Sequence, residues 1–359
     1  MMTESIQSNN DVENHVIYTD VLRILAIISV VILHASGNLG MTEPAGSLNW
    51  WAGVSVYCSM MFGVPVFFMI SGSLLLNQSK WNEDLRTFFK KRIIRVGIPF
   101  ITWILLLYFW EVYFSNKSFD ASTLATYLVT RPTNPYWFFY SIAGLYLATP
   151  VIRVFIKHAP EKLIRYYIYV WLFFYCFTFA ISYYTEVLIG IDNTIFYSYI
   201  GYFLLGYYLG NYEIEKKLPS SCFMYIFLSA LILSLILCYL ININSSGVDW
   251  FIYQKQSPLQ IIIQISIFLY VKAICDHADS FFHKHSETIR FFSAHVFGIF
   301  VVHLFVLQIF QRGMLGFKIN ALWINVFIGI TTLSFIVLVC SFLITYLLRK
   351  IPVIKYLIP

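Results

Sequence analysis

Apolar runs of about 20 residues recur from one end of the chain to the other, and no other feature constrains its fold as strongly. That length is what an α-helix needs to cross the hydrocarbon core of a bilayer. Of the 359 residues, 59% are hydrophobic and 12% are charged, and the mean hydropathy is +0.72, outside the range of a soluble globular protein. Because backbone polar groups in lipid need internal partners, the sequence predicts an all-α polytopic membrane helical bundle.

The apolar runs predict about ten transmembrane spans with a short tail at each end. The expected domains are a cytoplasmic N-terminal tail (1–16), a transmembrane domain (17–349) and a cytoplasmic C-terminal tail (350–359). The N-terminal tail has acidic residues but no Lys or Arg, so it lacks the basic region of a signal peptide, and the first span is expected to stay in the protein. The predicted spans are 17–36, 50–76, 91–115, 136–157, 163–184, 194–212, 221–243, 257–275, 294–311 and 321–348.

The basic residues predict the orientation of the bundle, because Lys and Arg accumulate in the cytoplasmic loops of membrane proteins. With the first tail inside, 19 of the 24 Lys and Arg residues lie on the cytoplasmic side of these spans and five lie outside. Both termini are therefore expected in the cytoplasm, and an even number of spans agrees with that.

Ionisable residues inside an apolar span are costly, and the first span holds Asp20, Arg23 and His34. Arg23 and His34 are eleven residues apart, so they project from nearly the same helix face, about 16 Å apart along the axis. Asp20 is one turn from Arg23, and the two are expected to form a neutralising ion pair. His34 could be a neutral imidazole bonded to a neighbouring helix, but ionisable residues in membranes are usually functional, and we interpret it as catalytic.

The third span begins with a cluster of basic residues in the segment FFKKRIIRVGIPF. Lys90 and Lys91 are explained by the positive-inside distribution, with side chains that reach the membrane surface. Arg95 lies one turn inside the apolar run and shares a helix face with Arg92. A guanidinium binds phosphate through paired hydrogen bonds, so phosphates of a cytoplasmic donor are the expected partner of Arg92 and Arg95.

Three motifs in chain order resemble those of the integral-membrane acyltransferase-3 family, which includes bacterial O-acetyltransferases of surface polysaccharides, and the resemblance spans the whole chain. Arg23 and His34 have the family's spacing of arginine, ten residues and histidine in the first helix. The segment GVPVFFMISG (63–72) matches its Phe-Phe-x-x-Ser-Gly pattern in the second helix. Arg92 and Arg95 match its Arg-x-x-Arg pattern in the third helix.

The resemblance implies a membrane-bound O-acyltransferase of a bacterial inner (plasma) membrane, in which residues 17–349 form the acyltransferase domain. The acyl group, expected to be acetyl from acetyl-CoA, would pass from acyl-CoA to a hydroxyl of a cell-envelope saccharide or lipid-linked saccharide. In this interpretation His34 is the general base, and Arg92 and Arg95 are catalytic and donor-binding residues. Arg23 lines the passage through the bundle that the donor occupies. Neither a metal nor a nucleic acid partner is expected.

Three further residues are expected to contact substrate. The segment WFFYSIAGLYLATPVIR looks like the family's fourth span and contributes Trp137 and Tyr146. Glu111, near the outer end of the third span, is either an interfacial carboxylate or a residue that orients His34 or binds an acceptor hydroxyl.

The segment GIFVVHLFV departs from the family's Tyr-Leu-x-His pattern, so we expect His303 to serve packing rather than catalysis.

Other kinds of site have little support in the sequence. The six cysteines lie in or at the edges of apolar runs, and neither disulfides nor a cysteine-based metal site is expected. The segment DHADSFFHKH lacks a fixed-geometry metal motif, so we interpret it as a solvated cytoplasmic loop. No Walker loop and no Gly-x-Ser-x-Gly elbow is present, which leaves nucleotide-driven transport and serine hydrolysis without support.

Two alternatives from other classes remain open. A ten-span bundle with buried charge also suits a transporter or flippase of a polysaccharide intermediate, although the sequence shows no inverted repeat with matching broken helices. A membrane sensor, or the membrane part of a larger enzyme, is the other alternative. Hydrolysis of a thioester would separate the acyltransferase from both.

Overall fold

The computed structural model describes the backbone of residues 2–114, 119–129, 136–185, 199–243, 249–276 and 281–358, with side chains from residue 17 onward. Within these ranges the chain forms helices and no strand, as predicted. The elements are α1 (Met2–Ala35), α2 (Leu39–Thr42), α3 (Leu48–Met60), α4 (Gly63–Leu75), η1 (Gln78–Lys80), α5 (Leu85–Arg92), η2 (Ile93–Gly97), α6 (Ile98–Phe114), α7 (Ala121–Val129), α8 (Trp137–His158), α9 (Glu161–Thr185), α10 (Ile200–Asn211), η3 (Glu215–Lys217), α11 (Ser220–Asn242), α12 (Pro258–Cys275), α13 (Phe281–Lys284), α14 (Ser286–Ser293), α15 (Val296–Arg312), α16 (Val326–Arg349) and η4 (Ile354–Tyr356).

Many of the helices are long and apolar enough to span a membrane. Among the described residues, eight segments are long and apolar enough to cross a membrane, and there are nine if α14 and α15, which meet at a bend of 48°, count as one span. Helices α3 and α4 form one such segment, and α5, η2 and α6 form another. The predicted span 194–212 corresponds in the described part of the chain to α10, which has 12 residues. The chain is therefore a multi-pass membrane protein.

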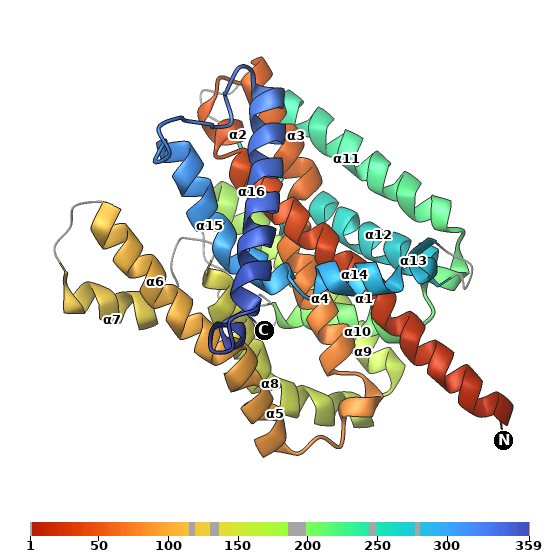
Figure 1. Ribbon diagram of the computed structural model, residues 1–359. Helices are drawn as coiled ribbons and strands as arrows, with labels where there is room; N and C mark the ends of the chain where they lie inside the picture. Colours follow the sequence, from red (N-terminus) through yellow and green to blue (C-terminus); the bar gives the residue numbers. More distant parts are fainter. Residues whose placement is uncertain are drawn as a thin grey trace.

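The C-terminal part of α1 lies in the middle of the bundle (Figure 1), and the helix contacts α3, α4, α12, α14, α15 and α16. Tyr18, Leu22, Ala26 and Val31 of α1 are completely buried. Peripheral helices such as α11 instead expose apolar side chains, as surfaces that face lipid do. The ionisable residues of the first span are thus held inside the protein, where they cost less than in contact with lipid.

Helices α4 and α10 pack closely because glycines remove side chains from their interface. A Cβ atom at Gly72 would lie 1.8 Å from the backbone oxygen of Phe203, and one at Gly206 would lie 2.0 Å from the backbone oxygen of Met69. Only glycine permits such an approach, as in the small-residue contacts common between membrane helices. Ser71, next to Gly72, lines the main cavity of the protein, so this packing fixes one wall of that cavity.

A buried lysine caps the C-terminal end of α10. The Nζ atom of Lys272 lies 2.8 Å from Oε2 of Glu215 and donates hydrogen bonds to the backbone oxygens of Leu209 and Tyr212, at 2.9 and 3.1 Å. Carbonyl groups at the end of a helix have no partner within it, and a cation there satisfies them. This basic residue therefore stabilises the fold in addition to fitting the predicted topology.

We expect Gly206→Ala to lower the stability of the protein by roughly 1–3 kcal/mol, because the added methyl group forces α10 away from α4. The thermal unfolding midpoint of the detergent-solubilised protein measures this. Gly144→Ala in α8 is the matched control, since nothing lies within 4 Å of a Cβ at Gly144. Equal midpoints for the two variants would contradict the close α4–α10 contact.

Candidate active site

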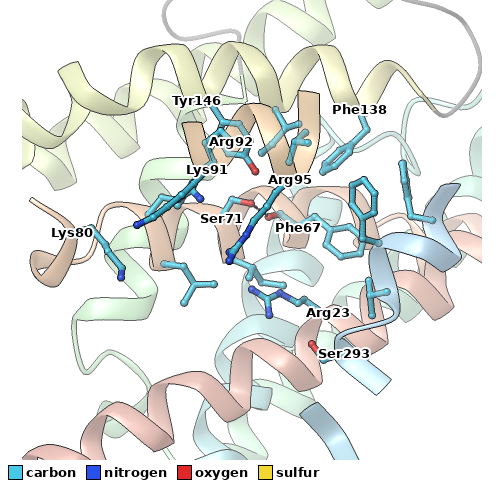
Figure 2. Close-up of a pocket in the computed structure, with 18 of the residues that line it drawn as sticks. Arg23, Phe67, Ser71, Lys80, Lys91, Arg92, Arg95, Phe138, Tyr146 and Ser293 are labelled. Carbon is cyan, nitrogen blue, oxygen red and sulfur yellow. Dashed lines mark hydrogen bonds between the residues drawn. The ribbon is translucent and has the colours of Figure 1, made fainter. Parts of the chain in front are cut away.

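A cavity of about 1050 Å³ lies among α1, α4, α5, η2, α8 and the junction of α14 and α15. This is at the upper end of the range of small-molecule sites, so an extended substrate fits. Figure 2 shows that Arg23 of α1 and Arg95 of η2 extend toward each other from opposite walls of this cavity. The charged residues of its lining are Arg23, Lys80, Lys91, Arg92, Arg95 and Glu83. Five cations and one carboxylate make the cavity suited to an anion.

Arg23 forms the ion pair that its spacing from Asp20 predicts. The Nη1 atom of Arg23 lies 2.8 Å from Oδ1 of Asp20, which also accepts a hydrogen bond from the Ser293 hydroxyl at 2.7 Å. Asp20 is 5% exposed, whereas Arg23 is half-buried. A guanidinium has five N–H donors, so Arg23 keeps donors for a ligand while Asp20 holds it in place.

Arg92 and Arg95 line the same cavity, and the helix changes geometry between them. Helix α5 ends at Arg92, and the next five residues form the π-helical turn η2, which contains Arg95. Such turns occur frequently at functional sites. The Arg92 guanidinium lies over the rings of Phe88 and Tyr146, at 4.9 and 5.6 Å from their centroids. Among the described residues no carboxylate forms an ion pair with either arginine, and Nε of Arg92 is buried without a hydrogen-bond partner.

Arg153 of α8 lies on the same Phe88 ring as Arg92, a contact that was not predicted from the sequence. Its Nε donates to the Leu75 backbone oxygen at 2.8 Å and its Nη2 to Oε2 of Glu83 at 3.2 Å. Its guanidinium also lies 4.8 Å from the Phe88 centroid, so this ring is in contact with two arginines. Burial raises the pKa of Glu83, but hydrogen bonds from Lys91 and Arg153 outweigh this and hold the pKa below its ordinary value.

His34 lies at the C-terminal end of α1, and its ring contacts that of His303 of α15. Their ring centroids are 5.4 Å apart, with an interplanar angle of 38°. His303 is completely buried, and its Nδ1–H donates to the Phe300 backbone oxygen at 2.6 Å. Its Nε2 is buried and has no hydrogen-bond partner among the described residues. Phe300 lines the cavity and its ring lies 5.9 Å from that of His303, whereas neither His34 nor His303 is among the residues that line the cavity.

The other predicted substrate residues lie in different surroundings. Tyr146 lines the cavity beside Arg92. Trp137 stacks on Tyr199 at 5.5 Å, and the Lys255 ammonium lies 4.9 Å from its ring centroid, outside the cavity lining. Glu111 of α6 accepts a short hydrogen bond from the Tyr127 hydroxyl of α7. Tyr146 thus lies in the cavity with Arg23, Arg92 and Arg95, while Trp137 and Glu111 lie elsewhere in the bundle.

The cysteines and the histidine-rich segment form no further site in the described part of the chain. All six cysteines are free, and the closest sulfur atoms, those of Cys58 and Cys238, are 3.9 Å apart. No group of three or more His, Cys, Asp or Glu side chains that could hold a metal is found among the described residues. His277 and Asp279 of the segment DHADSFFHKH lie outside the described ranges.

Residues 16–346 match the family model Acyl_transf_3, whose description is "Acyltransferase domain". The match covers most of the chain, so the chain belongs to this acyltransferase family, as its motifs predicted. With its membrane-spanning helices, the protein is a membrane acyltransferase. No curated protein and no solved structure matches the chain significantly.

We expect Glu83→Gln to lower the free energy of unfolding by roughly 2 kcal/mol at pH 7, because it removes the charged partner of the buried Arg153. The ionised form of Glu83 is the stabilising one, so the difference from the native protein should shrink as the pH falls below about 4. Chemical unfolding in detergent at several pH values measures this. Glu161→Gln, which breaks the exposed pair with Arg165, is the control and should cost less than about 1 kcal/mol. Similar losses for both variants would contradict the account.

Proposed function

We propose that the protein transfers an acyl group, acetyl in particular, from acyl-CoA to a hydroxyl of a cell-envelope saccharide at a bacterial inner membrane. The observation that carries this proposal is the cavity that contains two unpaired guanidiniums, those of Arg92 and Arg95, in a chain that belongs to an acyltransferase family. Both the sequence motifs and the charge of the cavity support an anionic acyl donor.

The donor would bind through its phosphates. Arg92 and Arg95 have no carboxylate partner among the described residues, and Arg23 faces Arg95 across the cavity (Figure 2). Hydrogen bonds between guanidinium and phosphate are charge-assisted and about twice as strong as neutral ones. Tyr146 and Phe88 hold the plane of Arg92, so less conformational entropy is lost when the donor binds. The basic residues also attract the anionic donor from the cytoplasm.

His34 would act as the general base at the acyl end of the donor. Arg23 and His34 lie on one helix about 16 Å apart, a distance that the extended pantetheine arm of acyl-CoA can span. His34 takes the proton of the acceptor hydroxyl while the oxygen attacks the thioester carbonyl. The C–S bond then breaks, and His34 returns the proton to the departing CoA thiolate. The products are an ester and free CoA, so atoms and charge balance. His303, whose ring centroid lies 5.4 Å from that of His34, would position the His34 ring.

The acceptor would approach from the outer side of the bundle, where Trp137 and Glu111 are the proposed contacts. Aromatic rings bind the apolar faces of sugars, and a carboxylate accepts hydrogen bonds from their hydroxyls. A transporter or flippase of a polysaccharide intermediate, the alternative function, would need no thioester chemistry. Release of CoA therefore distinguishes the two.

We expect His34→Ala to reduce glycan-dependent release of CoA from acetyl-CoA by about 100-fold or more, since a general base contributes that much to the rate. The purified protein in nanodiscs, with extracted envelope glycans, is assayed for free thiol. His158→Ala, at the exposed end of α8, is the control and should keep native activity. Full activity of His34→Ala would contradict its role as the base. A native protein that moves glycans across the bilayer without releasing CoA would favour the flippase.

Arg95→Gln should raise the KM for acetyl-CoA about tenfold, because it removes a charge-assisted hydrogen bond to the donor. Initial rates at varied acetyl-CoA and saturating glycan measure this, and Arg95→Lys should recover part of the loss because it restores the charge. Lys157→Gln removes an exposed cation outside the cavity and should leave the KM unchanged. An unchanged KM for Arg95→Gln would show that Arg95 does not bind the donor.

A further inference from the structure

A second, smaller cavity of about 340 Å³ lies where the C-terminal end of the chain meets η2. Figure 1 shows the C-terminus beside the junction of α5 and α6, and the Trp103 Nε1–H of α6 donates to the Leu357 backbone oxygen at 3.0 Å. The residues that line this C-terminal pocket are Ile94, Arg95, Arg349, Lys355 and Tyr356. The pocket thus shares only Arg95 with the main cavity.

The C-terminal pocket is cationic and its charges are held in place. The Nη1 atom of Arg349 donates to the Ala294 backbone oxygen at 2.6 Å, which leaves other guanidinium donors available. The Lys355 ammonium lies 5.3 Å from the Tyr356 ring centroid. None of the described residues that line the pocket is acidic, and neither Arg349 nor Lys355 forms an ion pair within the described ranges. An anion from outside the chain would neutralise them.

An apolar surface adjoins this cationic pocket. Ile94 in its wall is 38% exposed, and Ile98 and Ile101, which follow at spacings of four and three residues, are 44% and 52% exposed. These residues lie within the membrane-spanning segment Leu85–Phe114, so their exposed side chains face lipid. Tyr356, also in the wall, is 56% exposed. A ligand with a negative head and an apolar tail would match both surfaces.

We propose that the C-terminal pocket binds the phosphodiester headgroup of an anionic phospholipid, with an acyl chain along the exposed isoleucines of α6. Basic pockets between membrane helices on the cytoplasmic side are suited to anionic headgroups. A phosphomonoester in solution shares the phosphate chemistry but would leave the apolar surface unused. The lipid would also hold η2, the turn that carries Arg95, in position.

Binding is tested with short-chain phospholipids on the detergent-solubilised full chain. Dioctanoyl phosphatidylglycerol should raise the thermal unfolding midpoint, while the zwitterionic dioctanoyl phosphatidylcholine should not. Lys355→Gln should raise the lipid concentration for half-maximal stabilisation about fivefold, the loss expected for one basic residue near an anionic phosphate. Lys162→Gln, an exposed cation on α9, is the control and should respond as the native protein does.

The result separates the two sources of phosphate. Adenosine 3′,5′-bisphosphate is the monoester probe, and any stabilisation that it gives should be the same in Lys355→Gln as in the native protein. Stabilisation by the bisphosphate alone, lost in Lys355→Gln, would overturn the lipid site in favour of a soluble phosphate. Equal responses to both lipids, or an unaltered response of Lys355→Gln to phosphatidylglycerol, would also overturn it. Arg349→Gln gives a second, independent variant, and none of these readouts depends on acyl transfer.

Discussion

The cost of placing charge in a low-dielectric bundle determines how this protein is built. Asp20 neutralises Arg23, and Glu83 serves both Arg153 and Lys91, so these charges are compensated within the fold. Arg92 and Arg95 have no such partner among the described residues, and both line a cavity. The chain thus satisfies the charges that support its structure and leaves a cationic space for an anion to fill, which is what a membrane enzyme with an anionic donor requires.

Helix packing shapes the walls of that space. The glycine contacts between α4 and α10 bring Ser71 into the cavity wall, and the π-helical turn η2 brings Arg95 there. Helix α1 runs through the centre of the bundle with Arg23 at the cavity and His34 beside His303. One helix therefore carries both Arg23, which lines the cavity, and the proposed base. The close backbone contact with Phe203 explains why position 72 of the second span has to be glycine.

The sequence was sufficient to predict the helical membrane bundle and three arginines that line the cavity, Arg23, Arg92 and Arg95, because apolar length and helical spacing are local properties. It placed Arg92 and Arg95 on one face and Arg23 three turns from His34. Contacts between helices that are far apart in the sequence could not be predicted from these local properties. The pairing of Arg153 with Glu83 and of His34 with His303, and the bond from Tyr127 to Glu111, depend on how helices dock. His303 was expected to pack rather than to catalyse, and its buried ring packs against that of His34.

The central claim is that the acyl donor binds with its phosphates at Arg92 and Arg95 and its acyl end at His34. Electron cryo-microscopy of the protein in nanodiscs with a non-hydrolysable acetyl-CoA analogue, in which a methylene replaces the thioester sulfur, tests it most directly. The account predicts density for phosphates within hydrogen-bond distance of Arg92 and Arg95, and for the acyl end beside His34. An analogue bound with its phosphates away from these arginines, or with its acyl end remote from His34, would contradict it.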